Sequence, residues 1–146
     1  MRNKHWLKPR FVDLLREQNV ARVLQDRSWM PAPPELFEKM DPITADFTYI
    51  RWLGDRKEIE KITTVWNKTV VDRTRELQSW VDFCQKIQKR GVSQYVYANN
   101  HYAGFAPETI EQFRRLCAEK GIDVPLNVQV QMPVEWTLFD MSGSQD

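Results

Sequence analysis

The stretch from residue 95 to residue 107 restricts the possible folds of this chain more than any other. Residues 95–98 have the aromatic and β-branched character of a strand, and this run stops at Asn99 and Asn100. Pro107 then suits the first turn of a helix. A strand that leads through an amide-rich turn into a helix is typical of β/α proteins, whose functional rim lies at such turns. The sequence therefore predicts a site near the two asparagines.

The rest of the chain alternates in the same way. Residues 20–24 and 47–53 are predicted to form two earlier strands, separated by a proline-rich loop. Helices are predicted after Pro9, from about residue 71 to residue 90, and after Pro107. Apolar residues at helical spacing mark the inner faces of the last two helices: Leu77, Trp80, Val81, Cys84 and Ile87, then Ile110, Phe113, Leu116 and Cys117. Alternation of this kind predicts an α/β fold of parallel strands with covering helices.

The composition indicates one ordinary domain without a strong electrostatic preference. The 146 residues are 42% hydrophobic and 28% charged, as in globular proteins. The 21 basic and 20 acidic residues give a formal charge of +1, so charge alone does not favour nucleic acid or an anionic membrane as a partner. No run of about 18 apolar residues occurs, and we therefore expect no transmembrane helix and no membrane partner.

Several classes of site and cofactor find no support in the motifs. Cys84 and Cys117 lack the spacing of a disulfide framework or metal knuckle, and residues 1–6 lack the apolar core of a signal peptide. Both features predict a cytoplasmic protein with reduced cysteines. The two histidines lack metal-ligand spacing, so no metal site is predicted. No phosphate-binding glycine loop or nucleophile elbow appears, and the cofactor stays unknown.

Polar residues follow all three predicted strands, where ligands bind in parallel sheets. Asp26 follows the first strand, and Arg51 lies near the end of the second. Arg51 is either a fork for a phosphate or carboxylate, or half of an ion pair with Asp26 or another carboxylate. Arg2 has the same two interpretations.

The third strand end carries further candidates. Asn99 and Asn100 can orient a ligand hydroxyl, carbonyl or water, or can instead satisfy backbone groups at the turn. His101 is either an acid or base with a pKa near neutrality or a surface residue. Tyr102 and Gly104 are also candidate ligand-binding residues: either they shape this loop, or Tyr102 offers its hydroxyl and Gly104 permits close approach of a ligand.

Three segments resemble a known family. Residues 47–54 and 95–107 resemble two signature motifs of the YecE-like family, also called domain of unknown function 72. Residues 2–7 resemble the end of an earlier strand in that family, where members carry Glu-x-Arg and a nearby tryptophan. The resemblance covers about residues 2–120. Two differences stand out: Trp52-Leu53 replaces an apolar residue and a histidine, and no glutamate precedes Arg2.

The resemblance implies a TIM-type (β/α) barrel, and such a barrel needs about 250 residues. We therefore expect an incomplete barrel that corresponds to the C-terminal portion of the family fold. Residues 1–121 are expected to form this partial barrel, and residues 122–146 a C-terminal extension whose last residues are disordered. Open strand edges and an exposed inner face predict self-association when the chain is expressed alone.

Three functional hypotheses remain open at this point. The first is a barrel that binds an anionic or phosphorylated ligand through Arg51, Arg2 and the asparagines, with His101 as a proton carrier. Phosphodiester hydrolysis, in nucleic acid for example, is the reaction to test, on fold analogy alone. The second is a non-catalytic binding or scaffold barrel. The third is an inactive fragment of a longer protein, so whether the chain is an enzyme stays undecided.

Overall fold

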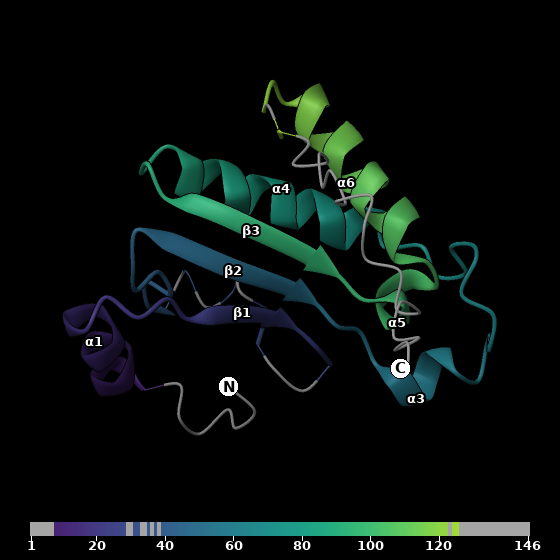
Figure 1. Ribbon diagram of the computed structural model, residues 1–146, viewed down its shortest axis with the longest axis horizontal. Helices are drawn as coiled ribbons and strands as arrows, with labels where there is room; N and C mark the ends of the chain where they lie inside the picture. The colour runs from purple at the N-terminus through teal and green to yellow at the C-terminus, as the bar shows by residue number, and fades with distance from the viewer. Residues whose placement is uncertain are drawn as a thin grey trace, which may run out of the picture.

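The computed structural model describes residues 8–28, 31, 32, 35, 37, 39–122, 124 and 125. Three parallel strands form one sheet in the order β1-β2-β3, with β2 in the centre (Figure 1). The elements follow one another as α1 (Pro9–Glu17), β1 (Val23–Asp26), β2 (Phe47–Trp52), α3 (Arg56–Ile59), α4 (Thr74–Gln88), β3 (Ser93–Ala98), α5 (Asn100–Ala103) and α6 (Ala106–Glu119). The predicted α/β class with parallel strands is confirmed.

The core lies between one face of this sheet and the helices α4 and α6. Leu24, Ile50 and Val96 point to this face from neighbouring strands, since their register positions coincide. In Figure 1, α4 runs along β3 and α6 lies next to α4. All five predicted inward residues of α4 are buried. In α6, Phe113 and Cys117 are buried, and Ile110 and Leu116 pack against the core.

The ends of the helices have local causes. Helix α4 begins at Thr74, three residues later than residue 71, and the Asp72 carboxylate before it accepts hydrogen bonds from the backbone N–H and hydroxyl of Thr74, at 2.9 and 2.6 Å. Asn19 adopts a positive φ of 48° after α1, as expected for a left-handed cap residue. Gly91, with φ 73°, follows α4 and also adopts the left-handed conformation.

Two boundaries differ from the sequence prediction. Strand β1 spans Val23–Asp26 rather than residues 20–24, because pairing with Tyr49 to Trp52 of β2 sets its limits. The short helix α3 has no counterpart among the predicted helices. The Asp55 carboxylate caps it by accepting from the backbone N–H groups of Lys57 and Glu58. Four residues are too few to show helical periodicity in a sequence.

The remaining predictions concern the cysteines, metal ligands, membrane-spanning helices and the two ends of the chain. Cys84 and Cys117 are free and buried, and burial raises the pKa of Cys117 to about 11. Within the described ranges no three His, Cys, Asp or Glu side chains gather into a metal-binding group. No helix there is long and apolar enough to cross a bilayer. Arg2 and nearly all of residues 122–146 lie outside the described residues.

A close approach of two backbone segments requires glycine at position 54, immediately after β2. Its φ is 64°, in the left-handed region. A Cβ atom at this position would overlap the carbonyl oxygen of His101 and lie 2.7 Å from the Cα of Tyr102. The end of β2 and helix α5 can therefore pack together only when residue 54 has no side chain.

We predict that Gly54→Ala lowers the free energy of unfolding by about 3 kcal/mol or more, through overlap added to backbone strain. Gly91→Ala is the matched control, because Gly91 has φ 73° but no atom within 4 Å of the added Cβ. Its cost is expected to be only about 1 kcal/mol. Urea unfolding of both variants measures the difference. Equal costs at the two glycines would contradict the close packing of α5 on the end of β2.

Candidate functional site

The carboxyl end of β1 is organised by one carboxylate. Asp26 Oδ2 accepts a hydrogen bond from Trp80 Nε1 of α4 at 2.8 Å and another from the Tyr102 hydroxyl of α5 at 3.1 Å. The carbonyl oxygen of Asp26 also accepts from the N–H groups of Leu53 and Gly54, which follow β2. We call Asp26, Trp80 and Tyr102 the Asp26 hub. It joins both strand ends to two helices.

Burial makes the hub a structural unit. Tyr102 is 1% exposed. Burial, followed by the nearby Asp26 carboxylate, raises the pKa of the Tyr102 hydroxyl, so this group stays a neutral donor. The Trp52 ring packs on Trp80 and Tyr102, with ring centroids 6.1 and 5.8 Å away, and on Phe113 at 4.8 Å. The structure therefore places Asp26 and Tyr102, both predicted to contact a ligand, in interior hydrogen bonds.

Arg73 extends the hub at the start of α4. Its Nε donates to the carbonyl oxygen of Tyr102 at 3.0 Å, and its guanidinium carbon lies 5.3 Å from the centre of the Tyr102 ring. Nη1 of the same side chain pairs with Glu76 at 2.9 Å. Arg73 therefore provides a second contact between α4 and α5, in addition to the hydrogen bonds of Asp26.

Arg51 lies on the other face of the sheet. In the register, Arg51 is opposite Gln25 and Tyr97, whereas Asp26 is opposite Trp52. Neighbouring residues of a strand point to opposite faces, so Arg51 and Asp26 cannot form an ion pair. Arg51 is exposed and makes no ion pair with a carboxylate of the described residues. The ion-pair interpretation with Asp26 is therefore wrong.

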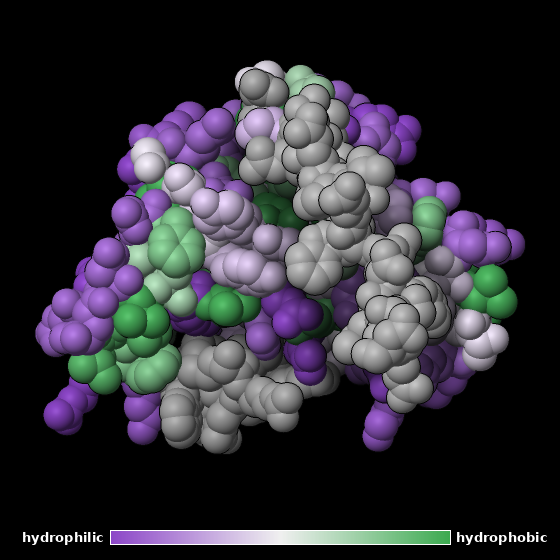
Figure 2. Space-filling view, viewed as in Figure 1, coloured by the Kyte–Doolittle hydropathy of each residue, from purple (hydrophilic) through white to green (hydrophobic). Residues whose placement is uncertain are grey.

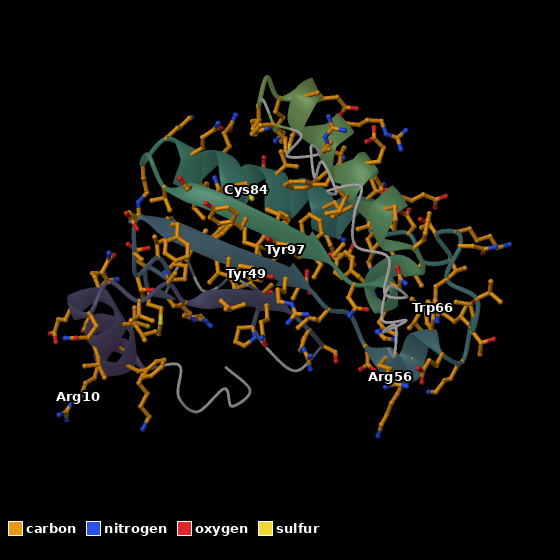
Figure 3. The ribbon with its side chains drawn as sticks, in the orientation of Figure 1. Arg10, Tyr49, Arg56, Trp66, Cys84 and Tyr97 are labelled. Atoms are coloured by element: carbon orange, nitrogen blue, oxygen red, sulfur yellow. The ribbon has the colours of Figure 1, made fainter. Side chains whose placement is uncertain are left out.

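Four aromatic residues share this face of β2 and β3 with Arg51. The rings of Tyr49 and Tyr97 are stacked, with centroids 4.5 Å apart and an interplanar angle of 16°, and Figure 3 shows them on neighbouring strands. The rings of Phe47 and Tyr95 meet edge to face at 6.2 Å. We call these four residues and Arg51 the open face, because Tyr95 and Tyr97 are 50% and 48% exposed. In Figure 2, pale residues of intermediate hydropathy gather over β2 and β3.

The two asparagines have partly backbone roles. Asn99 Oδ1 accepts from the N–H of His101 at 3.0 Å and caps α5. Asn100 Oδ1 accepts from the N–H of Ala106 at 2.9 Å, at the start of α6. The backbone interpretation therefore holds for both oxygens. The side-chain N–H groups of Asn99 and Asn100 form no hydrogen bond with the described part of the chain.

His101 belongs to a cluster beside this loop. Its Nε2 lies 3.8 Å from Glu60 Oε1, and the same Glu60 atom accepts from Arg56 Nε at 2.7 Å. The ring edge of His101 meets Trp66 with centroids 4.9 Å apart. Figure 3 places Arg56 and Trp66 at one end of the molecule, away from Tyr49 and Tyr97.

The remaining predicted residues shape loops. Gly104 has φ 114°, and a Cβ there would lie 2.6 Å from the carbonyl oxygen of Lys68. The adjacent Ala103 carbonyl accepts from the N–H groups of Val70 and Val71, so the loop at residues 68–71 packs directly on α5.

The Asp55 carboxylate, which follows β2, is also held by the protein. It accepts a hydrogen bond from the Ser28 hydroxyl, and this bond, together with those from the backbone N–H groups at the start of α3, lowers the pKa of Asp55.

Sequence reasoning missed the polar role of Trp80 and the position of Arg73. Helical spacing predicts that Trp80 lies in the core, which is correct for its ring. The spacing carries no information on the indole N–H, which needs a partner when buried. In the sequence, the polar role of Trp80 is indicated only by its place on the inner face of a predicted helix that covers the strands, where a buried indole N–H needs an acceptor.

We predict that Tyr102→Phe lowers the free energy of unfolding by about 1–2 kcal/mol, because one hydrogen bond to the Asp26 carboxylate is lost. Tyr97→Phe is the matched control. The Tyr97 hydroxyl makes no hydrogen bond to the described residues, and its removal should change stability by less than about 0.5 kcal/mol. Chemical denaturation measures both. A smaller loss for Tyr102→Phe than for Tyr97→Phe would contradict the hub.

Comparison with known proteins gives the family. The family model described as "Protein of unknown function DUF72" matches residues 1–133. A DUF72 family protein from Thermotoga maritima MSB8 is 21% identical, with a TM-score of 0.61 over 80% of this chain and 44% of that chain. A DUF72 family protein from Enterococcus faecalis V583 is 20% identical, with a TM-score of 0.55 over 86% of this chain and 47% of that chain.

These likenesses concern the fold, and this chain spans less than half the length of either solved relative. Comparison with curated proteins found no match. The family model covers most of the chain and agrees with the motifs at residues 47–54 and 95–107. The protein belongs to the DUF72 family.

Proposed function

We propose that the open face lines the interior of a TIM-type barrel and that this chain corresponds to its C-terminal portion. Parallel sheets are normally covered on both faces. Here α4 and α6 pack on one face, and the other presents exposed aromatic rings. A barrel covers such a face by closing on itself. Residues 1–121 would belong to the barrel and residues 122–146 to an extension.

An anionic or phosphorylated ligand is the proposed occupant of this interior, at the carboxyl ends of the strands. The observation that carries the proposal is Arg51, which presents an exposed guanidinium near the end of the central strand without a carboxylate partner among the described residues. A guanidinium binds phosphate or carboxylate through paired N–H donors. The unused amide N–H groups of Asn99 and Asn100 would orient the ligand, and Arg2 would add a second cation.

The hydrogen bonds at the strand ends support ligand binding without catalysis. The carboxylates of Asp26 and Asp55 are both held by hydrogen-bond donors of the protein, so neither is free to act as a general base beside Arg51. The protein would then be a binding or scaffold barrel, and an open interior face would promote self-association of the isolated chain.

Phosphodiester hydrolysis is the second candidate, with His101 as the proton carrier next to Glu60. Nucleic acid would be one such substrate. This candidate requires that His101→Ala abolish hydrolysis of a simple diester such as bis(p-nitrophenyl) phosphate. Absence of any hydrolysis by the unaltered protein leaves the binding proposal in place and removes the enzymatic one.

Arg51→Ala tests the binding proposal. We expect a nucleoside monophosphate, titrated by calorimetry, to bind Arg51→Ala about tenfold or more weakly than the unaltered chain, because the charged fork is lost. Arg115→Ala is the matched control, since Arg115 is an exposed arginine on α6. Equal binding by Arg51→Ala and Arg115→Ala would contradict the proposal.

A further inference from the structure

A second arginine is buried at the opposite end of the sheet, and two of its guanidinium nitrogens have no partner among the described residues. Arg22 directly precedes β1 and is 6% exposed. Its Nε and Nη1 atoms are both buried and form no hydrogen bond. Burial lowers the pKa of Arg22, but a guanidinium is so basic that it stays protonated in proteins. A permanent positive charge therefore lies in the interior.

The immediate contacts of Arg22 are neutral. Its backbone N–H donates to Thr44 Oγ1 at 2.9 Å, and the Thr44 hydroxyl donates to the carbonyl oxygen of Val20 at 2.7 Å. These bonds hold the backbone and leave the guanidinium uncompensated. The ion pairs of the described residues do not include Arg22. A buried charge is strongly unfavourable unless an acceptor or counter-ion pairs with it.

Two more unpartnered polar groups lie in the same row of the sheet. Val23 is opposite Tyr49, so the preceding residue, Arg22, lies beside Thr48, and Thr48 is opposite Gln94. Thr48 Oγ1 and Gln94 Oε1 are buried without hydrogen bonds. Residues in register point to the same face, which here is the face covered by helices.

The amide of Gln94 is oriented by α4. Its Nε2 donates to the carbonyl oxygen of Cys84 at 2.9 Å, which directs Oε1 away from that contact. The row therefore offers two guanidinium N–H donors, a hydroxyl that can donate or accept, and an amide oxygen that needs a donor. Buried groups of this kind are normally satisfied by water or a bound ion.

We propose that Arg22 and Thr48 bind a small oxyanion inside the protein, at the amino end of the sheet. Two oxygens of the anion would accept from Nε and Nη1 of Arg22, and the Thr48 hydroxyl would donate to it. An oxyanion that keeps a proton, such as hydrogencarbonate or dihydrogenphosphate, can also donate to Gln94 Oε1. Chloride cannot make this last bond. The site lies at the opposite ends of the strands from Arg51 and on the opposite face, so it is independent of the proposed ligand site.

Thermal unfolding in increasing hydrogencarbonate, at constant ionic strength set with chloride, tests this site. We expect the melting temperature of the unaltered chain to rise by at least about 4 °C, because the anion binds only the folded state. Arg22→Met should lose this response and, without added anion, should be no less stable, because an unpaired buried charge is removed. Thr48→Val should keep a weaker response.

Arg115→Ala is the control for removal of a positive charge elsewhere, because Arg115 is exposed on α6, and it should respond to hydrogencarbonate like the unaltered chain. An equal response of the unaltered chain and Arg22→Met would overturn the proposal and leave water or a protein group as the acceptor. If Arg22→Met does not fold, the Nε–H resonance of Arg22 in the unaltered chain decides by NMR. A shift that saturates with hydrogencarbonate supports the site, and an unchanged resonance overturns it.

Discussion

The arrangement of the strand ends depends on the carboxylate of Asp26. One oxygen of this group accepts from an indole N–H on α4 and a phenol hydroxyl on α5, and the backbone carbonyl of the same residue holds the chain after β2. Each donor is a buried or partly buried group that would otherwise lack a partner, and unsatisfied groups of this kind are unfavourable. The three elements are therefore positioned together, and the loops that leave the sheet are positioned with them.

This constraint determines which polar residues remain available to a ligand. Asp26 and Tyr102 are used by the hub, the oxygen of Asn99 caps α5, and the oxygen of Asn100 accepts from the N–H of Ala106. Arg51 differs because the alternation of strand residues sends it to the opposite face. There it lies next to stacked tyrosine rings and has no carboxylate partner in the described chain. The charge of Arg51 is the strongest remaining reason to expect an anionic ligand.

The sequence predicts the elements with strong periodicity and fails where tertiary contacts decide. The inner face of α4 is correct because five apolar residues recur at helical spacing. The limits of β1 are wrong because pairing with β2, which no local pattern shows, extends the strand to Asp26. The sequence also does not show which residues of β1 and β2 lie opposite each other. It therefore does not show that Asp26 and Arg51 point to opposite faces of the sheet. The YecE-like resemblance, in contrast, identified the family directly from three motifs.

The candidate sites likewise depend on tertiary contacts that the sequence does not show. Arg22 lies within a predicted strand and has no local feature that marks its guanidinium as buried. Only the packing of helices on that face reveals a charge without a partner. Gly54 and Gly104 could be predicted as turn residues, but their close contacts with α5 and with the loop at Lys68 depend on segments distant in the sequence.

A double-mutant cycle between Asp26→Asn and Trp80→Phe tests the central role of the Asp26 carboxylate most directly. Unfolding free energies of the two single variants and the double variant give the coupling between the side chains. If the carboxylate holds α4 through the indole N–H, the coupling should be about 1 kcal/mol or more. Losses that add to within about 0.3 kcal/mol would show that the two side chains act independently, and would contradict the account.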